Sequence, residues 1–171
     1  MEPKEYKEHI LEILAHRFEE NHNSLPDAYA LIWAIDVYAA LVSHKINGKD
    51  EDIGFKNELE AHCEPFKIIR SASNAIKHIE RRNDQCFVKS IDHIQAGKRA
   101  GFHAYFSNNG RSEASIAITM SWAYSAKTDA YSDASGKEIS PRPESSWKTQ
   151  YLRTIYRPAI EAIDIKLANS R

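Results

Sequence analysis

The stretch from Ala28 to Val42 is apolar on nearly every side of a helix, and Asp36 is its one charged residue. A helix that is apolar all round has to be surrounded by other elements. The run is also shorter than the roughly 20 residues that span a bilayer. We therefore expect a core helix from Ser24 to about Ile46, with Trp33 almost fully buried.

Further helices are expected on both sides of this run. Apolar residues recur at helical spacing from Pro3 to the Asn21-His22-Asn23 segment, and Ser24-Leu-Pro-Asp27 resembles a capping box. A short helix is expected over Phe55–His62, and another from Glu64 to about Ile79. Four helices with short connections predict a bundle.

The second half of the chain changes to the period of a strand. Large residues alternate with small or polar ones from Ser115 to Tyr124 and over Phe102–Phe106, with a hairpin signal at Asn108–Gly110 between them. Another strand is expected at Cys86–Ile94 and a turn at Asp133–Gly136. These features predict an antiparallel β-meander that packs its face of large side chains on the bundle.

A last amphipathic segment from Trp147 to Leu167 predicts a C-terminal helix, with a kink or break at Pro158. No internal repeat or long linker divides the 171 residues, so residues 1–171 are expected to form one domain. The predicted fold class is α+β: an N-terminal bundle of about four helices, a meander of three to four strands and a C-terminal helix.

The composition and the missing motifs exclude several classes of function. A formal net charge of −1 gives no overall attraction to nucleic acid or to an anionic membrane, so any attraction has to come from a local patch. The charged N-terminal segment has no signal sequence, so a cytoplasmic protein without a membrane partner is expected. The nucleotide-binding and hydrolase motifs are missing, and the histidines and two cysteines lack metal-ligand spacing. No cofactor or metal is expected, and enzymatic activity is left open.

The helix predicted from Glu64 carries the one constellation of candidate binding residues. Arg70, Asn74, Lys77, His78 and Arg81 fall within an arc of roughly 100°, opposite the apolar residues. All five can donate hydrogen bonds to anionic oxygen, and His78 can exchange a proton near neutral pH. The alternative is a solvated helix face whose charges pair with nearby acids.

Asp36 is a further candidate site residue because a buried carboxylate needs a partner or stays protonated. If the core helix packs on the Arg70–Arg81 helix, the partner is expected to be Arg70, Asn74 or His78. Three interpretations remain open: a structural pair that specifies the fold, a site for acid–base chemistry or anion binding, and simple exposure.

Two resemblances follow from these residues. The Asn74-x-x-Lys77-His78 run, with the predicted meander and Trp147 after it, resembles a diffuse set of uncharacterised bacterial domains. That resemblance covers about the central third of the chain and implies a fold, not an activity. The helical half is remotely similar to the HEPN class of bundles, whose ribonuclease members carry an Arg and, a few residues later, a His on one helix. Arg70 and His78 stand further apart, with seven residues between them.

Two functions from different classes follow as expectations. The favoured one is a small non-enzymatic binding or regulatory module that presents the Arg70–Arg81 face to an anionic ligand or RNA. The resemblance to HEPN bundles implies the other, a metal-independent ribonuclease that uses Arg70 and His78 in one cleft, often across a dimer interface. A purely structural face inside a homo-oligomer is a third possibility.

Overall fold

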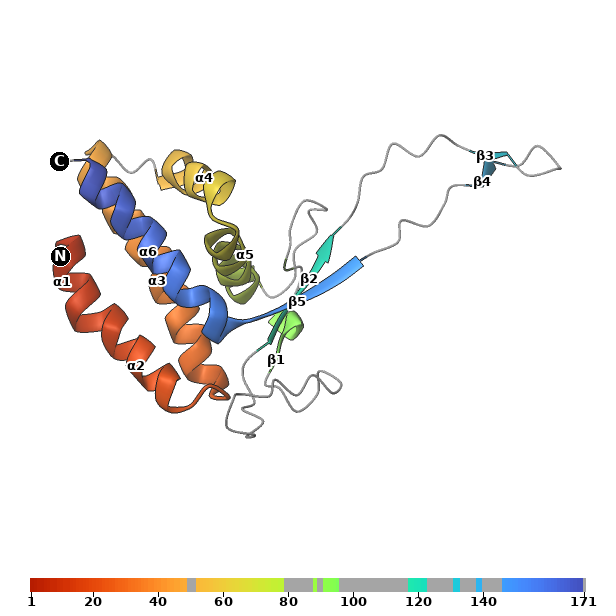
Figure 1. Cartoon of the computed structure of the whole chain (residues 1–171), viewed down its shortest axis with the longest axis horizontal. Helices are drawn as coiled ribbons and strands as arrows, with labels where there is room; N and C mark the ends of the chain where they lie inside the picture. Colours follow the sequence, from red (N-terminus) through yellow and green to blue (C-terminus); the bar gives the residue numbers. More distant parts are fainter. Residues whose placement is uncertain are drawn as a thin grey trace.

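The computed structural model describes residues 1–48, 52–78, 88, 91–95, 117–122, 131–132, 138–139 and 146–170. Most of these residues are helical, and the predicted helical bundle is confirmed (Figure 1). In chain order the helices are α1 (Pro3–Tyr6), the π-helical turn η1 (Lys7–Leu11), α2 (Glu12–Glu20), α3 (Leu25–Asn47), α4 (Asp52–His62), α5 (Glu64–His78), the 3-10 turn η2 (Ile91–His93) and α6 (Leu152–Asn169).

The long helix α3 contacts α2, α4, α5 and α6, so it is the centre of the bundle. Its ends follow the sequence signals. Ser24 Oγ accepts a hydrogen bond from the backbone N–H of Asp27 at 3.3 Å, and Gly48 ends the helix in the left-handed conformation with φ 64°. Glycine suits that conformation because it has no Cβ to clash.

Helix α3 is long and apolar enough to cross a membrane by length and composition alone. Half of its most apolar window is buried inside the described structure. Phe18, Tyr38 and Phe66 are among the largest fully buried side chains of the core around it.

The expectation that Trp33 is almost fully buried is wrong, because its side chain is 55% exposed. No helix among the described residues covers this side of α3. At about 100° per residue, Val37 and Ala40 fall on the same side, and both are only half-buried. An apolar residue on a core helix therefore did not guarantee burial.

Polar contacts fix α6 along the first helices. Arg157 Nη1 pairs with Glu12 on α2 at 2.8 Å. Further along α6, Asp164 accepts hydrogen bonds from Lys7 Nζ at 2.6 Å and from Tyr38 Oη at 2.7 Å. Tyr38 lies on α3 and Lys7 on η1, so one carboxylate joins three elements.

The predicted α+β class, with a meander of three to four strands on the bundle, is wrong for the described chain. The strand β2 (Ala117–Trp122) pairs with β1 (Ile94–Gln95) over two residues only, and its long antiparallel partner is β5 (Ser146–Tyr151). The two-residue strands β3 (Tyr131–Ser132) and β4 (Glu138–Ile139) pair separately. In Figure 1, β2 and β5 lead away from the helices and do not cover them.

Several predicted elements differ in detail. β2 falls within the predicted strand Ser115–Tyr124, whereas η2 replaces part of the strand predicted at Cys86–Ile94. The strand Phe102–Phe106, the hairpin signal Asn108–Gly110 and the turn Asp133–Gly136 lie outside the described residues.

The predicted C-terminal helix begins later than expected. Ser146–Tyr151 forms β5, and α6 starts at Leu152. The alternation of Trp147, Thr149 and Tyr151 suits a strand as well as a helix stripe, because aromatic and β-branched residues favour strands. α6 continues through Pro158, so the expected break is not present.

These burial values predict a clear contrast between two aromatic truncations. Phe66→Ala, in the closed core, should lower the free energy of unfolding by about 3–5 kcal/mol. Trp33→Ala should lower it by less than about 1 kcal/mol because its ring is largely in water. Urea melts of both variants measure the difference, and equal losses would contradict the exposure of Trp33.

Candidate functional site

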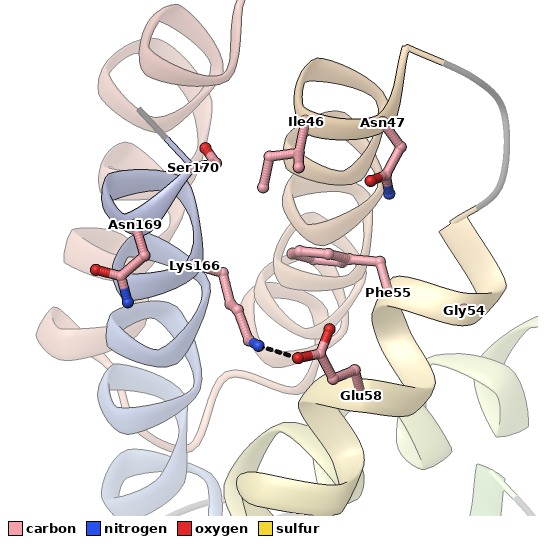
Figure 2. A pocket seen from close by; sticks show the side chains of 8 residues that line it. All are labelled: Ile46, Asn47, Gly54, Phe55, Glu58, Lys166, Asn169 and Ser170. Carbon is pink, nitrogen blue, oxygen red and sulfur yellow. Dashed lines mark hydrogen bonds and ion pairs between the residues drawn. The ribbon is translucent and has the colours of Figure 1, made fainter.

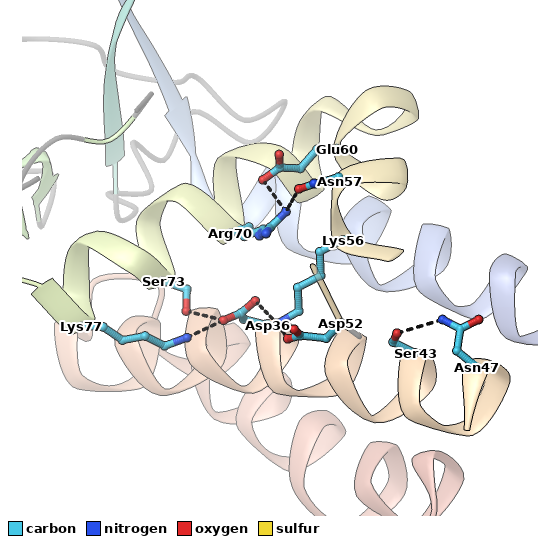
Figure 3. Close-up of polar contacts among 10 residues, drawn as sticks. All are labelled: Asp36, Ser43, Asn47, Asp52, Lys56, Asn57, Glu60, Arg70, Ser73 and Lys77. Atoms are coloured by element: carbon cyan, nitrogen blue, oxygen red, sulfur yellow. Dashed lines mark hydrogen bonds and ion pairs between the residues drawn. The ribbon is translucent and has the colours of Figure 1, made fainter. Parts of the chain in front are cut away.

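Asp36 lies in the middle of α3 and is only 3% exposed (Figure 3). Its Oδ2 accepts hydrogen bonds from Lys77 Nζ at 2.6 Å and from Ser73 Oγ at 3.0 Å. Its Oδ1 lies 2.9 Å from Lys56 Nζ. The buried carboxylate therefore has two cationic partners.

The helices bring these partners together by simple spacing. Ser73 and Lys77 are four residues apart on α5, so they share one face of that helix. Lys56 comes from α4, where it also pairs with Asp52 at 2.8 Å in an i,i+4 contact. The ammonium of Lys56 thus bridges Asp52 and Asp36, and the network joins α3, α4 and α5.

The carboxyl group of Asp36 titrates below its ordinary range. Burial raises the pKa of Asp36, but the ammonium groups of Lys77 and Lys56 outweigh burial and hold that pKa below its usual value of 3.8. Asp36 is therefore ionised at neutral pH. The two carboxylates of Asp36 and Asp52 thus balance the charges of the two lysines.

The three expected partners of Asp36 do not contact it. Arg70 turns instead to α4, where Nη1 donates to Asn57 Oδ1 at 2.9 Å and pairs with Glu60 at 3.3 Å (Figure 3). Its side chain is 15% exposed, so most of the guanidinium is used inside the fold. Asn74 is half-buried and His78 is exposed at the end of α5.

Sequence reasoning placed Lys77 on the correct helix but did not assign it to Asp36, and it missed Lys56 and Ser73. The i,i+4 spacing of Ser73 and Lys77 was a readable signal. The sequence gives no such signal for Lys56, because one lysine in a short charged helix is ordinarily solvated.

The predicted face is therefore divided along α5. Arg70 is neutralised by Glu60, and Lys77 is held by Asp36 while its side chain keeps 36% exposure. Arg81 lies outside the described residues. Arg70 and His78 are eight positions apart, which corresponds to about 12 Å along the helix axis. These two side chains do not form one cleft within the described part of this chain.

Among the described residues, no group of three or more His, Cys, Asp or Glu side chains is placed to hold a metal ion. No protein-family model, curated protein or solved structure matches this chain.

The buried network predicts a specific pattern of stability. Asp36→Leu leaves Lys56 buried with only Asp52 beside it and should cost on the order of 3–5 kcal/mol. The double variant Asp36→Leu/Lys56→Met removes both charges and should recover most of that loss, because an apolar pair of similar size is often as stable. Denaturant melts measure the free energy of unfolding of both variants. The control Glu8→Gln removes the acid of an exposed ion pair between Lys4 and Glu8 and should change little. An Asp36→Leu variant that is as stable as the wild type would show that the network is dispensable.

The lowered pKa of Asp36 also predicts how this stability depends on pH. At a pH above the ordinary pKa of 3.8, the ionised Asp36 makes its full contribution to the free energy of unfolding. As the pH falls through the lower folded pKa, the folded state takes up the proton and the contribution is lost. The difference in unfolding free energy between the wild type and Asp36→Asn should therefore shrink in acid. A difference that stays constant through this range contradicts the assignment.

Proposed function

We propose that this chain is a small non-enzymatic binding module that contacts an anionic partner at the C-terminal end of α5, through Lys77 and His78. The observation that carries the proposal is the position of these two side chains. His78 is exposed, and Lys77 reaches the surface from a network that fixes its place. At the other end of the face, Arg70 is occupied by α4.

The anchoring of Lys77 supports a binding role. A free lysine loses rotamer freedom when it meets a ligand, whereas Lys77 is already ordered by Asp36. Because the C-terminal end of a helix carries partial negative charge, Lys77 also has to offset that charge before an anion is attracted to this end of α5.

The chemistry of these donors favours a phosphate-bearing partner, and RNA is the one we choose. Ammonium groups and the N–H of a histidine ring donate to phosphate oxygen without reading sequence. The net charge of the chain is near zero, so affinity has to come from this local patch and should fall as salt rises.

Binding of a labelled single-stranded RNA, followed by fluorescence anisotropy at several salt concentrations, tests the proposal. The double variant Lys77→Gln/His78→Ala is first checked for folding by a thermal melt, because Lys77 is a partner of buried Asp36. It should weaken binding and lower the slope of log affinity against log salt by about 0.7 for each phosphate that the variant no longer neutralises. The control Lys4→Gln removes a lysine that is 82% exposed on α1 and should change neither quantity. Failure of the wild type to bind at low salt, or an equal loss in the control, would rule the proposal out.

The same RNA distinguishes a ribonuclease. If the wild type cleaves it and both Arg70→Ala and His78→Ala abolish cleavage while remaining folded, the protein is an enzyme and the binding-module proposal is wrong. Intact RNA together with salt-sensitive binding supports the module.

A further inference from the structure

A cavity of about 430 Å³ opens at the end of the bundle where α3 and α6 finish and α4 begins (Figure 2). This volume lies within the roughly 300–1,000 Å³ of ordinary small-molecule sites. We call it the end cavity, and it shares no residue with the Asp36 network or the polar face of α5. Its lining residues are Ile46, Asn47, Gly54, Phe55, Glu58, Lys166, Asn169 and Ser170.

Among the described residues, the wall of the end cavity carries one acid and one base that face each other. Lys166 on α6 pairs with Glu58 on α4 across the gap between the two helices (Figure 2). Their side chains are 31% and 55% exposed, so both charges can be reached from solvent. Phe55, which is only 6% exposed, extends its ring towards α6 beside this pair, and half-buried Ile46 adds a second apolar side chain. The cavity thus combines both signs of charge with an apolar surface.

Two helix ends add hydrogen-bond acceptors. α3 ends at Asn47 and α6 at Asn169, and both residues line the cavity. The last four carbonyl groups of a helix have no intrahelical donor, so helix C-termini attract positive charge. Lys166 itself lies in the last turn of α6, and Glu58 faces it from α4, so Glu58 offers a place for a cation and Lys166 a place for an anion.

We propose that the end cavity binds a free amino acid with an apolar side chain. The ammonium group of the ligand meets Glu58, and its carboxylate meets Lys166. Its side chain lies against Phe55 and Ile46. The ligand exchanges one protein ion pair for two, and partly exposed ion pairs cost little to open.

This arrangement selects a zwitterion over a simple amine or acid. A ligand with one charge opens the Glu58–Lys166 pair but satisfies only one of the two side chains, so the other is left without an ionic partner. Blocking either charged group of an amino acid should therefore weaken binding strongly, even though the apolar side chain is unchanged.

Gly54 offers a way to narrow the cavity without damage to the fold. A Cβ atom built on Gly54 meets nothing within 4 Å, so a larger side chain starts in open space at the cavity wall. Gly54 lies within α4, where leucine has the better helix propensity. Gly54→Leu should keep the bundle intact and narrow the rim of the cavity.

Titration calorimetry with leucine, N-acetylleucine and leucinamide tests the proposal. Leucine should bind to the full chain, and each blocked analogue should bind at least tenfold more weakly. The inference is overturned if leucine and phenylalanine give no binding at millimolar concentration, or if N-acetylleucine binds as well as leucine.

Three variants test the location of the site. Glu58→Gln and Lys166→Gln should each weaken leucine binding at least tenfold, and Gly54→Leu should also weaken it. The control Glu161→Gln changes an exposed acid on α6 that does not line the cavity and should bind as the wild type does. Thermal melts establish that the variants are folded. Undiminished binding by folded Gly54→Leu and Glu58→Gln would place the amino acid elsewhere and overturn the assignment.

Discussion

The arrangement of the bundle depends on one buried carboxylate. Asp36 is the single charge in an otherwise apolar stretch of α3, and burial of an unpaired charge is far more costly than any surface contact can offset. Lys77 and Lys56 remove that cost from two sides. Because they come from different helices, α4 and α5 can satisfy Asp36 only in a narrow range of positions. The charge thus restricts how the helices pack, which an apolar core of similar volume would leave less defined.

The same network separates what is structural on α5 from what is free to bind. Arg70 and Lys77 look equivalent on a helical wheel, yet one is committed to α4 and the other reaches the surface from a buried anchor. A charge count along the helix does not distinguish them. Lys77 and His78 are the exposed members of the predicted face on α5, whereas the end cavity presents an acid and a base that face each other.

The sequence predicted the helices well because their signals are local. Caps, glycine stops and the 3.6-residue period act within a few residues, and α3 starts and ends where Ser24 and Gly48 indicate. The strands and the exposure of Trp33 depend on which segments come together, and a period alone does not contain that information. Trp147 illustrates the limit, since its spacing fits the apolar stripe of a helix and the alternation of β5 equally. For the candidate site, the helix and Lys77 were predictable, while Lys56 depended on the packing of α4.

The position of α6 in the chain has a consequence for synthesis on the ribosome. α6 contacts both α3 and α5, but residues 79–151 separate it from α5 in sequence. During translation, α1 to α5 emerge and can associate while the side of α3 that α6 covers stays open to solvent. Contacts between distant segments form late and leave apolar surface exposed in the meantime. The nascent chain therefore passes through a stage in which its most apolar helix is only partly covered, and molecular chaperones that bind exposed apolar segments should recognise the unfinished chain more readily than the completed one.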